Sequence, residues 1–199
     1  MRQPPAPKRL PEPGLGRKDQ VMNNALVMTI IGQDRPGLVE AVAGVVAEHG
    51  GNWLESRMSR LGGQFAGILR IEIPAEREAA LNRALTQLQA RGLAIVVHPD
   101  RPQPAAGART MTLIEVVGHD RPGIVRQISH ALASHGVNVE ELHTELQSAP
   151  MSGEILFKAQ ARLSLPPNCS LAELRKELEK IAADLIVDIS FSEPVAEKS

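Results

Sequence analysis

The amino-acid sequence predicts an α+β protein that consists of two consecutive βαββαβ modules. Three observations lead to this prediction. The stretch from Gly32 to Glu55 recurs 86 positions further along the chain (118 − 32), without a gap, which is the signature of a repeated structural unit. Each copy is followed by the same order of strand and helix signals, and proline-rich segments precede and separate the two copies.

The first copy is GQDRPGLVEAVAGVVAEHGGNWLE and the second, from Gly118, is GHDRPGIVRQISHALASHGVNVEE. The identical positions, in first-copy numbers, are Gly32, Asp34, Arg35, Pro36, Gly37, Val39, Ala47, His49, Gly50, Asn52 and Glu55. Gly67 and Gly153 keep the same offset, and an insertion before Pro166 is expected to break it. We therefore predict a first domain over residues 25–99 and a second over 111–194.

Residues 1–24 and 100–110 are expected to lie outside both domains. The first segment is rich in proline and poor in apolar residues, so it cannot bury enough surface to offset the entropy of ordering and is predicted to be a disordered tail. An interaction arm that uses its basic residues Lys8, Arg9, Arg17 and Lys18 is the alternative. The second segment, with prolines and small residues, suits an extended linker.

In the first repeat the elements follow one another as strand, helix, two strands, helix and strand. Apolar residues recur at helical spacing from Leu38, and Gly50 ends this first helix. Gly62-Gly63 marks a hairpin, and Leu81, Leu85 and Leu88 share one face of the second helix. The predicted strands are 26–31, 53–61, 64–73 and 93–97.

The second repeat shows the same order. Its first helix carries Ile124, Ile128 and Leu132, and its second begins at a capping box formed by Ser170 and Glu173. The predicted strands are 111–117, 137–146, 155–165 and 186–191. This order is the ferredoxin-like arrangement, in which helices cover one face of an antiparallel sheet. Because a module of about 80 residues is small, pairing with other modules would help its stability, and a homo-oligomer is expected.

Composition excludes several classes of function. The net charge is −1 and the chain has only three Phe, one Trp and no Tyr, so neither a charged nor an aromatic surface for nucleic acid is expected. The single Cys169 favours a reducing compartment, and no apolar run approaches the roughly 18 residues of a membrane span. With no signal-peptide pattern, we expect a cytoplasmic protein without a membrane or direct nucleic-acid partner.

The repeated Asp-Arg-Pro-Gly turn is the strongest local signal. Since proline suits the first helical position, we predict Arg35 as the helix N-cap, Pro36 at the first and Gly37 at the second helical position, with Asp34 just outside. A bare backbone at a helix start offers amides to an anion such as the carboxylate of an amino acid. Equally, the pair Pro-Gly could serve only to make a tight strand-to-helix turn.

Other polar residues give weaker signals. Asn52 and Asn138 follow the glycine that ends each first helix, where an amide side chain either meets a ligand or satisfies the turn. His49 and His135 suit the helix C-terminus through its dipole. The sequence has no nucleophile elbow, no phosphate-binding glycine motif and no spaced metal-ligand set. No catalytic residue, metal or cofactor is therefore predicted.

Both repeats, with their Asp-Arg-Pro-Gly turn and the downstream His-Gly-x-Asn, closely resemble the ACT domain, a regulatory module that binds amino acids. In that family, ligands lie between modules, near the first loop, the start of the first helix and the second strand. The resemblance therefore implies these candidate ligand contacts: Asp34, Arg35, Pro36, Gly37, Leu38, Asn52, Asp120, Arg121, Pro122, Gly123, Ile124 and Asn138. The copies differ at Trp53 against Val139 and at Gln33 against His119, so one site is open to having lost binding.

A chain of two such domains is similar to the glycine cleavage system transcriptional repressor family. The resemblance implies a non-catalytic sensor of an amino acid, with glycine or serine as candidates, that regulates transcription or metabolism through a protein partner. A ligand-free assembly module is the alternative. Formyltetrahydrofolate deformylase also starts with such a domain, but the second repeat occupies the place of its catalytic domain.

Overall fold

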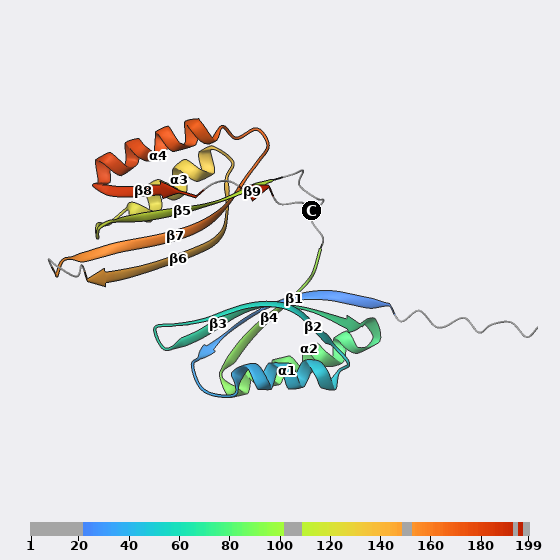
Figure 1. Ribbon diagram of the computed structural model, residues 1–199. Coiled ribbons are helices and arrows are strands. Elements are labelled where there is room, and N and C mark those ends of the chain that lie inside the picture. Colours follow the sequence, from blue (N-terminus) through green and yellow to red (C-terminus); the bar gives the residue numbers. More distant parts are fainter. Residues whose placement is uncertain (1–21, 102–108, 149–152, 193–194, 197–199) are drawn as a thin grey trace, which may run out of the picture. The chain divides into compact units, whose positions relative to one another are not determined.

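The computed structural model of the protein describes residues 22–101, 109–148, 153–192 and 195–196 (Figure 1). The predicted tail up to residue 21 and the predicted linker over 102–108 lie outside the described residues. The chain divides into two compact units, one for each repeat. None of the helices in the described ranges is long and apolar enough to cross a bilayer.

The first module is the predicted βαββαβ unit. Its strands form one antiparallel sheet in the order β2-β3-β1-β4, and both helices lie on the same face (Figure 1). Two short 3₁₀ turns, η1 (Ala75–Arg77) and η2 (Leu88–Arg91), flank the second helix. The elements are β1 (Asn23–Gln33), α1 (Leu38–Glu48), β2 (Asn52–Leu61), β3 (Gln64–Pro74), α2 (Glu78–Gln87) and β4 (Leu93–Pro99).

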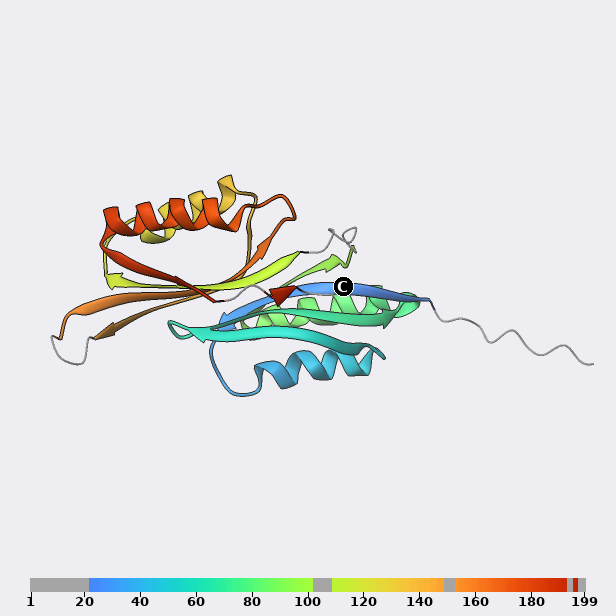
Figure 2. The ribbon, with the colours of Figure 1, turned by 45° about the horizontal axis from the view of Figure 1, so that its top comes forward.

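The second module repeats this topology with the order β6-β7-β5-β8. A two-residue strand, β9 (Val195–Ala196), also pairs with the start of β5. Figure 2 shows α3 and α4 together on one side of the sheet. The elements are β5 (Thr110–His119), α3 (Ile124–Ser134), β6 (Asn138–Ser148), β7 (Ile155–Leu165), α4 (Leu171–Leu185) and β8 (Val187–Phe191). The predicted α+β fold of two ferredoxin-like modules is confirmed.

Each module has a hydrophobic core of its own between helices and sheet. In α1 the buried residues recur every four positions, at Leu38, Val42 and Val46, so one helical face is covered. In the strands, alternate residues point into the core and burial follows the period of two. Ser170 caps α4 by accepting a hydrogen bond from the Glu173 amide at 3.3 Å, as the predicted capping box requires.

The prediction that Gly67 and Gly153 correspond is wrong. Gly67 lies inside β3, whereas Gly153 precedes β7 in the hairpin connection. Phe65 pairs with Gly32 and Phe157 with Gly118, so the two phenylalanines are the equivalent residues, at an offset of 92 (157 − 65). The six additional residues (92 − 86) therefore lie between β6 and β7, because a surface hairpin accepts extra length without disturbing the sheet.

Candidate ligand-binding site

The loop between the first strand and first helix of each module contains the repeated turn. Helix α1 begins at Leu38, and its N-cap is Gly37 in the left-handed conformation (φ 89°, ψ 3°). Gly123 does the same before α3, with φ 99°. The predicted helix start, with Arg35 as N-cap and Pro36 and Gly37 in the first turn, is therefore wrong. The chain reverses from strand to helix through a left-handed residue, which glycine adopts at little cost.

In the first module the two charged residues of this loop are bound within the module. The Asp34 carboxylate forms an ion pair with Arg60 of β2, with Nε and Oδ2 at 2.7 Å. The Asp34 amide donates to the Gly63 carbonyl at 2.9 Å. The Arg35 guanidinium donates to the carbonyl of Arg91 in η2. Both charged side chains of the first loop are thus already bound by residues of the first module.

In the second module the equivalent residues Asp120 and Arg121 are both exposed. Within the described part of the chain, neither side chain has a hydrogen bond or ion pair. For Asp120 the cause is a change of partner, because Leu146, which pairs with Phe157, stands where Arg60 pairs with Phe65. In the loop before α3, a carboxylate and a guanidinium are thus adjacent and have no partner among the described residues.

Asn52 and Asn138 lie at the other end of their modules. Asn52 pairs with Glu72 at the first residue of β2, whereas Asp34 follows the last residue of β1. Helix α1, of 11 residues, separates the two ends by about 16 Å at 1.5 Å per residue. The Asn138 amide donates to Glu140 at 2.8 Å. Within one module, the structure therefore does not bring the asparagine to the turn.

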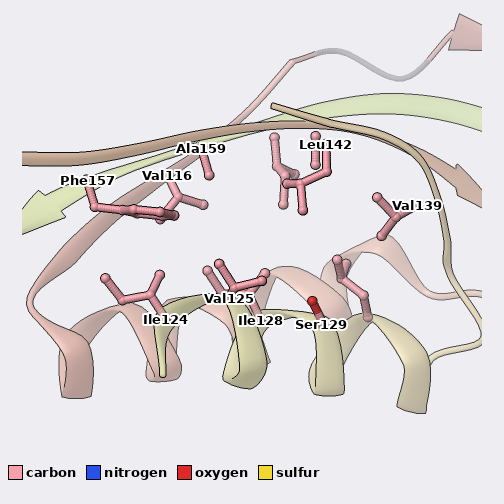
Figure 3. Close-up of a pocket in the computed structure, with 12 residues that line it drawn as sticks. Val116, Ile124, Val125, Ile128, Ser129, Val139, Leu142, Phe157 and Ala159 are labelled. Atoms are coloured by element: carbon pink, nitrogen blue, oxygen red, sulfur yellow. The ribbon is translucent and has the colours of Figure 1, made fainter. Parts of the chain in front are cut away.

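An apolar pocket lies beside the second turn, between α3 and the helix-facing side of the sheet (Figure 3). Ile124, which directly follows Gly123, lines it together with Val125 and Ile128 of the same helix. Val116, Phe157 and Ala159 face them from the sheet (Figure 3). Ser129 is the one polar residue among those that line the pocket, and none of them is ionisable.

At three positions around the equivalent space the first module has larger side chains, whereas in place of Leu142 and Ala159 it has the smaller Ser56 and Gly67. Trp53 and Met58 of β2 pack against its core, and Leu69 of β3 is fully buried there. By strand register the second module has Val139, Thr144 and Ala161 at these positions. Large-to-small changes at facing positions leave unfilled space because the surrounding backbone relaxes only partly. The mismatch of Trp53 with Val139 was the signal in the sequence that pointed to this difference between the modules.

Two further groups of polar side chains lie outside the pocket. His135 at the end of α3 contacts Glu177 of α4, with Nε2 and Oε2 at 2.7 Å, whereas His49 bonds the Val45 carbonyl in its own helix. On the other sheet face, hydrogen bonds from Gln160 and Lys158 lower the pKa of Glu115 below its usual value. These contacts hold elements together, so we assign them structural roles.

Two ferredoxin-like modules in tandem, each with an Asp-Arg-Pro-Gly turn between its first strand and first helix, thus define the class of the protein. The family model of the ACT domain matches residues 24–98 and 110–192. The chain belongs to the ACT-domain family, with one domain for each repeat.

Known proteins are similar to this chain over most of their own length and over at least 80% of it. The glycine cleavage system transcriptional repressor of Escherichia coli (strain K12) is 24% identical over 163 residues, which cover 80% of this chain and 85% of the relative. A crystal structure of an unknown protein from Galdieria sulphuraria is 30% identical with a TM-score of 0.73, over 87% of this chain and 99% of that one. A protein assigned as a glycine cleavage system transcriptional repressor has a TM-score of 0.63 at 20% identity, covers 88% and 99%, and shares the fold.

Proposed function

We propose that the protein is a non-catalytic regulator that senses a free amino acid through the turn of its second module. The observation that carries this proposal is the pair Asp120 and Arg121 in the loop before α3, whose side chains have no partner within the described ranges. An amino acid is a zwitterion, so its ammonium group suits the carboxylate and its carboxylate suits the guanidinium. The first module has the same residues but already uses them internally.

We propose further that the signal passes to a protein partner in the cytoplasm, and that the protein acts as a homo-oligomer. The name of the E. coli relative points to control of transcription, and the charge of this chain points away from direct DNA contact. Within one module the asparagine and the turn lie at opposite ends. In an oligomer, Asn52 or Asn138 of one module would be able to approach the turn of another. Glycine and serine remain candidate ligands on the resemblance alone.

The second candidate function is assembly without a ligand. It is favoured by one observation on the first module, whose sheet face away from the helices carries Ile31, Ile68 and Val96, each more than half exposed. Such an apolar patch is typical of a surface that another protein covers.

Isothermal titration calorimetry with each of the twenty free amino acids tests the proposal. We expect the titration to show a binding heat. The substitutions Arg121→Ala and Asp120→Ala should each weaken the affinity tenfold or more, because a charge-assisted contact is lost. Arg35→Ala is the matched control and should leave binding unchanged, since Arg35 serves its own module. Silence with all twenty amino acids would contradict sensing and favour assembly.

For DNA we expect negligible affinity of the purified protein for duplex at physiological salt. Non-specific binding is driven mainly by counterions that DNA releases when lysine and arginine side chains neutralise its phosphates. A chain with a net charge of −1 has no excess of such side chains. A gel-shift assay at submicromolar protein checks this expectation. A sequence-specific shift with the protein alone would show that no partner is needed.

A further inference from the structure

We propose that two copies of the chain associate through the open sheet faces of their first modules, as a dimer with a two-fold axis. This inference rests on the homo-oligomer of the proposed function and names the surface that would form it. It does not depend on which amino acid binds. The surface is an apolar patch on the four-stranded sheet, formed by these side chains: Ile31, Ala66, Ile68, Ala94 and Val96.

The patch lies on the sheet face opposite the two helices, which cover the other face (Figure 1). Along each strand its members alternate with buried residues, so Ile31, Ile68 and Val96 point away from the core and are exposed. Among the described elements of this module, none covers the patch. A contiguous apolar surface of this kind is typical of a protein interface.

Strand register makes the patch continuous. Ile31 of β1 pairs with Ala66 on one side and with Ala94 on the other. The neighbouring row is centred on Thr29 and contains the other two members of the patch. Directly paired side chains lie about 5 Å apart, so the two rows form one surface without a gap.

The second module shows that the fold does not require an apolar face. By strand register, it has these residues in place of the patch: Val117, Lys158, Gln160, Asp188 and Ser190. Lys158 and Gln160 contact Glu115 at 3.1 and 2.7 Å, so polar contacts already join this face. Since both modules share one topology, the apolar face is a property of the sequence of the first module.

The chemistry of the patch favours an identical patch as its partner. Apolar surface is removed from water most favourably when the covering surface is also apolar. The open face of a second module would instead bring charged side chains such as Lys158 and Asp188 against hydrocarbon, where they lose their hydration. The patch of another copy has no charged member.

The shape of the patch suits a two-fold contact. A shallow hollow in this face is lined by small residues, Ala66 and Ala94, as well as by the longer side chains of Ile31 and Ile68. One face therefore supplies both the hollow and the side chains that could fill it. Two copies related by a two-fold axis are able to exchange these contacts, as a self-complementary interface requires.

The area of the face is sufficient for a dimer. Its strands have 7 to 11 residues, so at about 3.3 Å per residue and about 4.8 Å between strands the face measures about 33 by 19 Å. Two such faces in contact would cover roughly 1,200 Å², which is the lower limit for stable specific interfaces. Gln64 and Arg70, which flank the patch along β3, would lie in the polar rim.

Sedimentation velocity of the full-length protein tests the association. We expect the wild type to be a dimer at micromolar concentration. Two variants take residues that the second module has at the equivalent positions: Ala66→Lys, and separately the double change Ile68→Gln with Val96→Ser. Each should weaken dimerisation at least about a hundredfold, because like charges meet in the first and apolar contact is lost from both copies in the second.

Leu113→Ser is the matched control. Leu113 is 52% exposed on the open face of the second module, so the change removes a similar apolar side chain from the face that the inference leaves unpaired. This variant should remain a dimer. Circular dichroism checks that all variants are folded, as expected for residues that the same fold already carries in its other module.

A folded patch variant that dimerises with wild-type affinity would overturn the inference and leave a homo-oligomer formed through another surface. A monomeric wild type would overturn both the inference and the homo-oligomer, and would leave the patch to a different protein. Amino-acid sensing is measured separately by titration calorimetry and is not affected by either outcome.

Discussion

Substitution of Gly123 by Val should destabilise the second module by about 1–3 kcal/mol, and Gly37→Val should do the same to the first. Both glycines have positive φ angles, 99° and 89°, in a region that a β-branched residue adopts only with strain. Space is not the reason, since an added Cβ would find its nearest neighbour at 3.9 Å in each case. Thermal unfolding without a ligand measures the loss.

Gly123→Asn and Gly37→Asn are the matched controls. Asparagine adds a side chain at the same place but tolerates the left-handed region, so most of the stability should return. If Asn and Val destabilise equally, conformational strain is not what selects glycine. Because strain is expected whether or not a ligand binds here, Val cannot separate a turn residue from a ligand contact. Ligand titration of the Asn variant, which keeps the fold, can make that distinction.

The second large effect concerns the two cores. Leu174 of α4 and Leu81 of α2 are both 0% exposed, and truncation of a buried leucine to alanine costs about 2–5 kcal/mol. For a module of this size, that loss should lower the melting temperature by at least about 8 °C. Since the cores share no residue, Leu174→Ala should affect the second module and Leu81→Ala the first.

Hydrogen exchange followed module by module measures this selectivity. We expect faster exchange of buried amides only in the module that carries the substitution. Equal loss of protection in both modules, for either variant, would show that the cores unfold as one cooperative unit.

The sequence by itself determined the fold class and the position of nearly every element. The spacing of Leu38, Val42 and Val46 and the alternation along the strands are local patterns, and burial of one face follows from them directly. The offset of 86 was sufficient to predict two modules of equal topology. The N-cap at Ser170 was also correctly identified, because its partner, the Glu173 amide, lies within the same turn.

Only the tertiary structure decided which charged side chains of the two turns are already bound within their own module. Asp34 and Asp120 each begin the same Asp-Arg-Pro-Gly turn, but whether the carboxylate has a partner depends on Arg60 or Leu146, which lie more than twenty positions away on another strand. The helix start at Leu38, with Gly37 as N-cap, likewise depends on how the chain turns back after β1, whereas local propensity favoured a start at Pro36.

The pocket is the clearest example of a feature that the sequence alone does not predict. It results from Val139 and Ala161, which lie on different strands and become neighbours of α3 only when the sheet has formed. The two repeats differ at Trp53 and Val139, but the sequence does not show whether other side chains occupy the space that the tryptophan would fill. Volume in a core is the sum of side chains that are distant along the chain, so it becomes defined only when packing brings them together.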